Sequence, residues 1–152
     1  MNRENYERAL TVRLFQASNA LQVMLDKILK KDDLTAKQFF MMIMVANFEA
    51  DPNINDLSQT FKTSHQNVKQ VLLKLEKKSF VNMYKDPNDK RILRVSMTDE
   101  AKTFWSKRDK QDEARMHDLF KDIPTEHLEI VLKTFMTLIN QMERIDTSWP
   151  GQ

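Results

Sequence analysis

Glycine and cysteine are the two residue types that this 152-residue sequence most lacks, with one glycine and no cysteine. The glycine, Gly151, stands beside the C-terminus, so the chain cannot build the glycine-rich loops that bind phosphates in nucleotide-binding folds. A glycine-poor chain also argues against a β-sandwich or barrel, which needs many tight turns. The missing cysteines exclude disulfides, zinc–thiolate sites, cysteine nucleophiles and redox sensing by thiols.

Long apolar runs are missing as well. The longest, residues 39–46, is far shorter than the roughly 20 residues of a membrane-spanning helix. The residues that follow Met1 do not have the pattern of a signal peptide. We therefore expect a cytoplasmic protein with no membrane partner. Hydrophobic residues make up 41% of the chain and charged residues 30%, a balance that permits one domain with a real core.

The net charge of +2 is distributed unevenly along the chain. Between Lys62 and Arg94 there are nine basic and three acidic residues, a net +6 that leaves −4 for the remainder. A basic segment on a nearly neutral chain indicates an anionic partner bound at one place. A solvated charged face is the simpler interpretation if charge is the only observation.

Apolar periodicity predicts a mainly α-helical chain with a long helix near each end. The first covers residues 5–30 and the last begins at Thr125, each with an apolar stripe along one side. Thr35 and Gln38 have capping-box spacing and open a helix that is apolar almost all round through residue 48, which should lie at the centre of the fold. Another long helix is expected after a cap at Thr98, from Asp99 to about residue 120.

The middle of the chain has the pattern of a helix-turn-helix followed by a hairpin. A short helix is expected from residue 56 to about 61, capped by Asn55, with a very short strand at Ile54. A second capping-box match that begins at Thr63 opens a helix to about residue 78. Two short helices separated by a few residues form a helix-turn-helix. Residues 80–84 and 92–96 then read as two strands around a turn at 86–90.

The helix that follows Ser64 carries a polar face suited to the major groove of DNA. Glutamine can form paired hydrogen bonds with adenine, and lysine can contact guanine or phosphate. The free N–H groups at the start of the helix suit a phosphate. Leu73 interrupts the polar face, where it either meets a thymine methyl or packs under the hairpin. A plain surface helix is the simpler interpretation of this face taken alone. The face consists of Gln66, Lys69, Gln70, Leu73, Lys74 and Lys77.

Basic residues also cluster at the turn of the hairpin. A narrow protrusion that carries arginine beside a helix-turn-helix can enter the minor groove, where the negative potential is strongest. Asp86 and Asp89 lie in the same turn, and a carboxylate near Arg91 can hold its guanidinium in one orientation. The alternative is a charged turn that only water contacts. The basic residues are Lys85, Lys90, Arg91 and Arg94.

Residues from about 34 to 101 resemble the winged helix-turn-helix of MarR-type bacterial transcription regulators. The resemblance rests on the stretches Leu57-Ser58-Gln59-Thr60-Phe61, Thr63-Ser64-His65-Gln66-Asn67-Val68, Leu75-Glu76-Lys77-Lys78-Ser79-Phe80-Val81 and Val95-Ser96-Met97-Thr98-Asp99-Glu100-Ala101. The most specific one is Asp86-Pro87-Asn88-Asp89-Lys90-Arg91, which is similar to the family's Asp-x-x-Asp-x-Arg wing signature. The family usually has glycine where Ser79 stands and often where Ala101 stands. Without glycine after the second helix, we expect that turn to be built differently.

The resemblance implies a mainly α fold in three parts. Residues 34–98 would form the winged helix-turn-helix DNA-binding lobe, with three helices and a small β-hairpin wing. Residues 1–33 and 117–148 would form a helical dimerisation region, and 99–116 a connecting helix.

The resemblance also implies a function, that of a sequence-specific transcription regulator, more a repressor than an activator. Its partner would be double-stranded DNA, bound as an imperfect palindrome by a homodimer. The residues implied at the major groove are Ser64, His65, Gln66, Asn67, Lys69, Gln70 and Lys74, and those of the wing are Asp89, Lys90 and Arg91.

A small-molecule effector is a further expectation that rests on the resemblance. Members of the family bind small, often aromatic ligands between the dimerisation helices and the DNA-binding lobe. The chain has ten methionines, so a pocket lined by methionine and phenylalanine and using Phe15, Phe39 or Met42 is one interpretation. Ordinary core packing is the simpler one.

Nothing in the sequence predicts an enzyme or a bound cofactor. No serine has a recognisable histidine and aspartate partner, and Glu113 with His117 is one helical pair of metal ligands, which does not make a site. Two other functions stay open at this point. One is a winged-helix protein-interaction module that does not bind DNA, and the other is a small helical enzyme.

Overall fold

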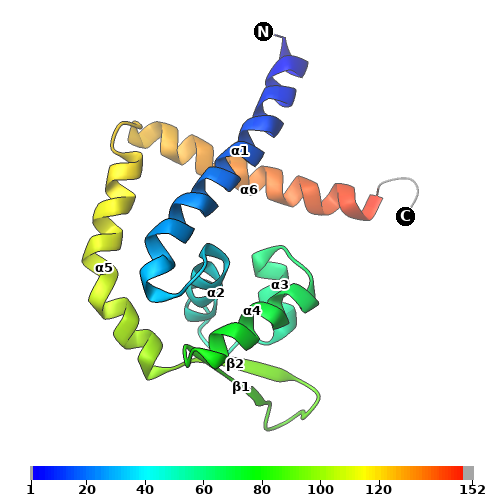
Figure 1. The fold of residues 1–152 in the computed structure, drawn as a ribbon. Helices are drawn as coiled ribbons and strands as arrows, with labels where there is room; N and C mark the ends of the chain where they lie inside the picture. Colours follow the sequence, from blue (N-terminus) through cyan, green and yellow to red (C-terminus); the bar gives the residue numbers. More distant parts are fainter. Residues whose placement is uncertain (1, 149–152) are drawn as a thin grey trace. The chain divides into compact units, whose positions relative to one another are not determined.

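The computed structural model describes residues 2–148, with side chains through residue 145. The chain divides into two compact units, Met1–Ser106 and Lys107–Gln152, so that the boundary falls inside one long helix. The elements, labelled in Figure 1, are α1 (Arg3–Leu29), the 3-10 turn η1 (Lys30–Asp32), α2 (Ala36–Ala46), α3 (Ile54–Phe61), α4 (His65–Lys77), β1 (Val81–Lys85), β2 (Leu93–Met97), α5 (Asp99–Phe120) and α6 (Thr125–Ser148). The mainly α fold with one small hairpin is confirmed.

Helix α2 is the centre of the first unit. It begins with the expected capping box, in which Gln38 N donates to Thr35 Oγ1 at 3.3 Å and Thr35 N donates to Gln38 Oε1 at 3.1 Å. The helix packs against α1, α3, α4 and β2. Met41 and Met42 are therefore fully buried, as the all-round apolar character of this segment predicts.

Helix α3 begins earlier than the sequence indicated. The cap is Asn53, whose Oδ1 accepts from Asp56 N at 3.0 Å while Asp56 Oδ2 accepts from Asn53 N at 2.9 Å. This reciprocal pair starts the helix at Ile54, so the expected strand at Ile54 and the expected cap at Asn55 are both wrong. The extended residue is Asn53, which forms an isolated β-bridge with Arg94.

Helix α4 begins one residue later than the predicted capping box. Its cap is Ser64, whose Oγ accepts from Asn67 N at 3.2 Å. Thr63 is not the cap; its Oγ1 accepts instead from the side-chain amide of Asn67 at 3.1 Å. The inner side of α4 is fully buried and is formed by Val68, Leu72 and Leu75.

Helix α4 ends in a turn of the kind that glycine usually makes. Ser79 has a φ of 60°, in the left-handed region. Ser79 N donates to Glu76 O at 2.9 Å and Phe80 N donates to Leu75 O at 3.0 Å, which are the two hydrogen bonds of a Schellman motif. The expectation of a differently built turn is therefore wrong: serine adopts the left-handed conformation at a cost of about 1–2 kcal/mol.

The strands β1 and β2 form an antiparallel hairpin whose register pairs Val81 with Met97 and Lys85 with Leu93. Val81 and Val95 are buried in the core of the first unit, while the turn at residues 86–92 projects away from the helices (Figure 1). We call this hairpin with its turn the wing. Each strand lies one residue later than the sequence pattern placed it.

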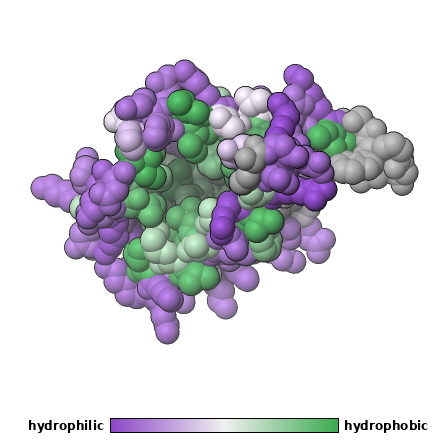
Figure 2. Space-filling view, turned by 90° about the horizontal axis from the view of Figure 1, so that it is seen from above, coloured by the Kyte–Doolittle hydropathy of each residue, from purple (hydrophilic) through white to green (hydrophobic). Residues whose placement is uncertain are grey.

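Helices α5 and α6 follow the sequence pattern closely. The expected cap at Thr98 is present, because Ala101 N donates to Thr98 Oγ1 at 3.1 Å. In the second unit α6 exposes a long row of apolar side chains. Figure 2 shows hydrophobic (green) surface among hydrophilic (purple) residues on one face of the molecule. None of the helices within residues 2–148 is long and apolar enough to span a membrane. The exposed apolar residues of α6 are Ile130, Val131, Leu132, Phe135, Met136, Ile139, Met142 and Ile145.

Candidate nucleic-acid interface

The outward side of α4 carries the predicted reading residues. Because Val68, Leu72 and Leu75 hold one side of the helix in the core, the residues between them face outward. Leu73 is among these outward residues, with 48% of its surface exposed, and it is not part of the hydrophobic core. We call the exposed set Gln66, Lys69, Gln70, Leu73 and Lys74 the reading face.

The first turn of α4 is fixed by side-chain contacts from the preceding segment. His65 Nε2 lies 3.1 Å from Asn55 Oδ1, so a residue of α3 sets the orientation of the imidazole. Ser64 and Asn67 are both exposed, but the Ser64 hydroxyl already accepts the Asn67 backbone N–H. The sequence alone did not indicate Asn55 as a partner of His65. The ten-residue separation of the two offered no periodic signal for the contact.

At the tip of the wing, Arg91 is held by Asp89. Arg91 Nε donates to Asp89 Oδ1 at 3.1 Å and Arg91 Nη2 donates to Asp89 Oδ2 at 3.0 Å, a bidentate pair. The pairing with Arg91 lowers the pKa of Asp89 and raises the pKa of Arg91. The arginine side chain is nevertheless 91% exposed, so its guanidinium is both oriented and accessible. Lys90 beside it is also exposed.

At the base of the turn, Asp86 is a buried organising residue. Its Oδ2 accepts from Arg94 Nε at 2.5 Å, and its Oδ1 accepts from the backbone N–H groups of Asn88 at 2.8 Å and Asp89 at 3.1 Å. The hydrogen bond from Arg94, followed by those two backbone donors, holds the pKa of Asp86 below its usual range. An acid in a basic wing is thus explained: Asp86 shapes the turn that presents Arg91.

Arg94 faces inward and joins the wing to the segment before α3. Besides its pair with Asp86, its Nη1 donates to Asp51 O at 2.8 Å. Tyr84 on the facing strand donates from its hydroxyl to Asp51 Oδ2 at 2.6 Å, and this bond raises the pKa of Tyr84. The sequence pattern grouped Arg94 with the accessible cations of the turn. No local sequence pattern separates it from them, because Asp51 lies 43 residues away.

The residues considered for an effector lie in different surroundings. Phe39 and Met42 are buried in the core, where the Phe39 ring lies 4.8 Å from that of Trp105. Phe15 on α1 is 70% exposed. The structure therefore favours core packing for Phe39 and Met42, and an effector site that uses these residues stays a prediction.

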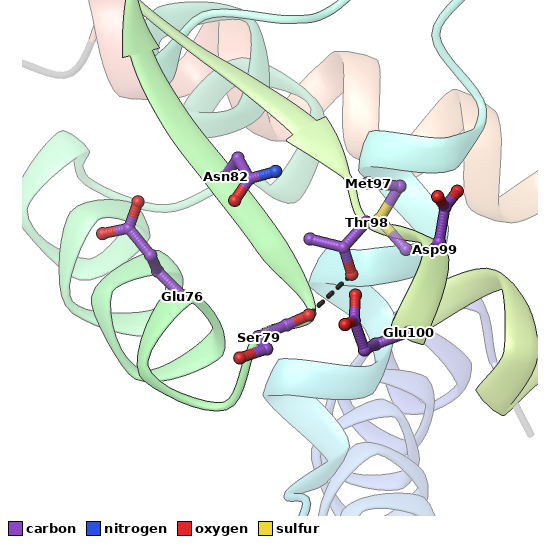
Figure 3. A pocket seen from close by; sticks show the side chains of 7 residues that line it. All are labelled: Glu76, Ser79, Asn82, Met97, Thr98, Asp99 and Glu100. Carbon is purple, nitrogen blue, oxygen red and sulfur yellow. Dashed lines mark hydrogen bonds between the residues drawn. The ribbon is translucent and has the colours of Figure 1, made fainter.

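A pocket of about 440 Å³ lies at the base of the wing, between the end of α4 and the start of α5. Figure 3 shows its lining side chains and the hydrogen bond that Thr98 Oγ1 donates to Ser79 O at 2.6 Å. Three carboxylates, from Glu76, Asp99 and Glu100, line it, and Met97 is the apolar contributor. This polar lining does not resemble the apolar effector pocket considered above. Among the described residues, no group of three or more histidines or acids is placed to hold a metal ion.

The comparisons with known proteins identify this arrangement. The model of the MarR family matches residues 34–93, the part that contains the helix-turn-helix and most of the wing. The segment with the helix-turn-helix and the wing is therefore similar to the MarR family. The match ends at the first residue of β2 and leaves out α1, α5 and α6.

Individual proteins extend the likeness beyond the matched segment. The uncharacterized HTH-type transcriptional regulator YhbI of Bacillus subtilis (strain 168) is 25% identical over 133 residues, which cover 84% of this chain and 86% of the relative. A MarR protein from Peptoclostridium difficile has a similar structure, with a TM-score of 0.79, 19% identity, and coverage of 89% of this chain and 88% of that one. A mutant MarR from E. coli complexed with operator DNA has a TM-score of 0.74 at 20% identity, with 89% and 99% covered.

Proposed function

We propose that this chain is a DNA-binding transcription regulator of the MarR family that acts as a homodimeric repressor on an imperfect palindrome. The observation that carries the proposal is the pairing, within one compact unit, of an exposed polar helix face with an exposed arginine held in place by Asp89. An α-helix such as α4 fits the major groove, and the oriented guanidinium of Arg91 fits the narrower minor groove. The structural similarity to a MarR that was solved with operator DNA also supports DNA binding.

The roles of individual residues follow from their chemistry and exposure. Gln66, Asn67 and Gln70 would contact base edges in the major groove, with Lys69 and Lys74 on guanine or on phosphates. Ser64 and His65, at the N-terminus of α4, would contact phosphate or base edges through side chains and free backbone N–H groups. In the wing, Arg91 would enter the minor groove while Asp89 fixes its orientation and Lys90 contacts the backbone.

The dimer is proposed from the exposed apolar side chains of the terminal helices. On α1 these include Tyr6, Leu10 and Phe15, and α6 exposes the longer row given above. A soluble monomer rarely leaves so many neighbouring apolar side chains open to water, because each loses the free energy of burial. Burying α1 and α6 against a second copy removes this cost and gives the two reading faces that a palindrome requires.

Repression and its relief follow from the same geometry. A dimer that covers a promoter blocks polymerase, so repression is the expected regulatory sign. The two α4 helices must be spaced by about one turn of DNA, roughly 34 Å. A small-molecule effector would relieve repression if it binds more tightly to a dimer with another spacing. The proposed site of action is the cytoplasm, where the DNA lies.

The test is the salt dependence of binding to duplex DNA. A duplex is first selected from a randomised pool by repeated binding to the purified protein, and its affinity is then measured by fluorescence anisotropy at several salt concentrations. We expect the logarithm of the association constant to fall with the logarithm of salt concentration by about 0.9 per neutralised phosphate. A flat salt response, or a pool that does not enrich, would contradict DNA binding and favour the protein-interaction module instead.

A further inference from the structure

Leu73 is an apolar side chain on an otherwise polar surface of α4. Its neighbours in sequence on the inner side, Leu72 and Leu75, are fully buried, whereas 48% of Leu73 is exposed. The residues three and four positions before it, Gln70 and Lys69, are polar and exposed. The core of the first unit therefore does not account for this leucine.

The direction of the side chain places it among the residues proposed to contact bases. Side chains of an α-helix lean toward its N-terminus, so Leu73 covers the turn that carries Lys69 and Gln70. From Gln66 to Leu73 the helix rises about 10 Å, which is less than the roughly 12 Å width of the major groove. The reading face from Gln66 to Leu73 can therefore lie within one groove, with Leu73 three residues after Gln70 on the same side of the helix.

We propose that Leu73 is a specificity-determining residue that contacts the C5-methyl group of a thymine in each half-site; this inference rests on the proposed DNA-binding function. The thymine methyl is the apolar group that a base pair presents in the major groove. Gln70 suits an adenine, and a neighbouring side chain reaches the adjacent base steps. The thymine contacted by Leu73 should consequently lie within about two base pairs of the one read by Gln70.

The contact distinguishes bases because a methyl group buried against leucine is lost when the base is changed. Replacement of thymine by deoxyuridine removes that methyl and leaves the hydrogen-bonding edge and the pairing intact. Removing one buried methyl should weaken binding by about fourfold per half-site, which corresponds to about 0.8 kcal/mol. Two symmetric replacements in a palindrome should weaken it by roughly 15-fold.

The experiment is a thymine-to-deoxyuridine scan of the selected duplex, with the intact protein and with Leu73→Ala. We expect one symmetric pair of thymines at which deoxyuridine weakens the wild type by roughly 15-fold and Leu73→Ala by less than twofold. Leu73→Met, which keeps an apolar chain of similar reach, should retain most of the sensitivity. Lys77→Ala is the matched control on the same helix, and its effect should be equal on the thymine and deoxyuridine duplexes. Thermal unfolding followed by circular dichroism checks that Leu73→Ala is folded.

The possible results distinguish a failure of the Leu73 contact from a failure of the proposed DNA binding. A selected duplex whose every thymine methyl is dispensable for the wild type would overturn the role of Leu73 while DNA binding stands. The role of Leu73 would also be overturned if deoxyuridine at a sensitive thymine weakened the binding of the wild type and of Leu73→Ala to the same extent. A pool that does not enrich would overturn the proposed DNA-binding function, and the Leu73 contact with it.

Discussion

The guanidinium of Arg94 lies against the carboxylate of Asp86, with Arg94 Nε 2.5 Å from Asp86 Oδ2, across eight residues of chain that include the whole tip of the wing. The same guanidinium donates from Nη1 to the backbone of Asp51, in the segment that leads to α3. Asp86 in turn accepts the backbone N–H of Asp89, and Asp89 holds Arg91. One continuous set of hydrogen bonds thus connects the helix-turn-helix with the exposed arginine.

The first prediction concerns Arg94→Lys. Lysine keeps the positive charge but cannot bond Asp86 and Asp51 at once in the planar fork of arginine. We expect the wing to lose its fixed position, so that affinity for the selected duplex falls by about fivefold or more although no proposed DNA contact is removed. The further loss caused by Arg91→Ala should also be smaller in this background than in the wild type.

A double-mutant cycle measured by anisotropy tests this coupling. Independent, additive losses would show that Arg94 does not position Arg91. Circular dichroism on each variant distinguishes a mobile wing from an unfolded lobe.

The second prediction is a pH dependence that comes from Asp86. Its pKa in the folded protein is held below the ordinary value of 3.8, first by the Arg94 hydrogen bond and then by the N–H groups of Asn88 and Asp89. The ionised group therefore contributes stability that is fully present above pH 3.8 and is lost as the pH falls through the lower, folded-state value. We expect Asp86→Asn to reduce the slope of unfolding free energy against pH in this acid range.

Urea unfolding between pH 5 and pH 2 measures that slope. Asp109→Asn, at an exposed position on α5, is the matched control and should leave the curve unchanged. Equal slopes for the wild type and Asp86→Asn would contradict the prediction.

The third prediction concerns the wing tip. Arg91→Ala should lower affinity for the selected duplex about tenfold at physiological salt, since each half-site loses a charged contact. Asp89→Asn should have a smaller effect, because it keeps Arg91 but removes the bidentate bond that orients it. Arg3→Ala is a matched control, since Arg3 is also exposed and paired with a carboxylate, that of Glu7 at 2.7 Å, but lies outside the lobe. Affinity that is unaffected by Arg91→Ala would refute the wing assignment.

Local chemistry accounts for the features that the sequence predicted well. The capping box at Thr35, the cap at Thr98 and the hairpin each depend on residues a few positions apart, so their pattern is visible in the sequence. The inward role of Arg94 was missed because its partner Asp51 lies 43 residues away and no local pattern records that contact. Ser79 was misjudged because the Schellman hydrogen bonds and the packing of the next strand outweigh the preference of serine for negative φ. Which base each reading-face residue contacts stays a prediction.

The fourth prediction concerns the oligomeric state. Phe135 and Met142 are 43% and 56% exposed, so charging them does not open a buried core of the isolated chain. If α6 forms the dimer contact, Phe135→Glu with Met142→Glu should give a monomer near 18.0 kDa with much weaker affinity for a palindrome. Light scattering after size exclusion measures the mass. Lys133→Glu, on the same helix, reverses a charge without altering the apolar row and should leave the mass of the dimer unchanged. A double variant that keeps the dimer mass would remove α6 from the interface.

The fifth prediction is that Ser79→Gly stabilises the protein. Glycine has no Cβ to oppose the φ of 60° at this position, and the two Schellman hydrogen bonds use backbone atoms that the substitution retains. The left-handed cost removed is about 1–2 kcal/mol, and the extra freedom of glycine in the unfolded chain returns part of it. We expect a net gain of about 0.5–1 kcal/mol, or an unfolding temperature higher by roughly 2 °C. The same substitution at Ser106, inside α5, should instead destabilise by about 0.5 kcal/mol, the difference in helix propensity between serine and glycine. Calorimetry on both variants measures the change in stability. A loss of stability in Ser79→Gly would contradict the prediction and would mean that the serine side chain itself supports the turn.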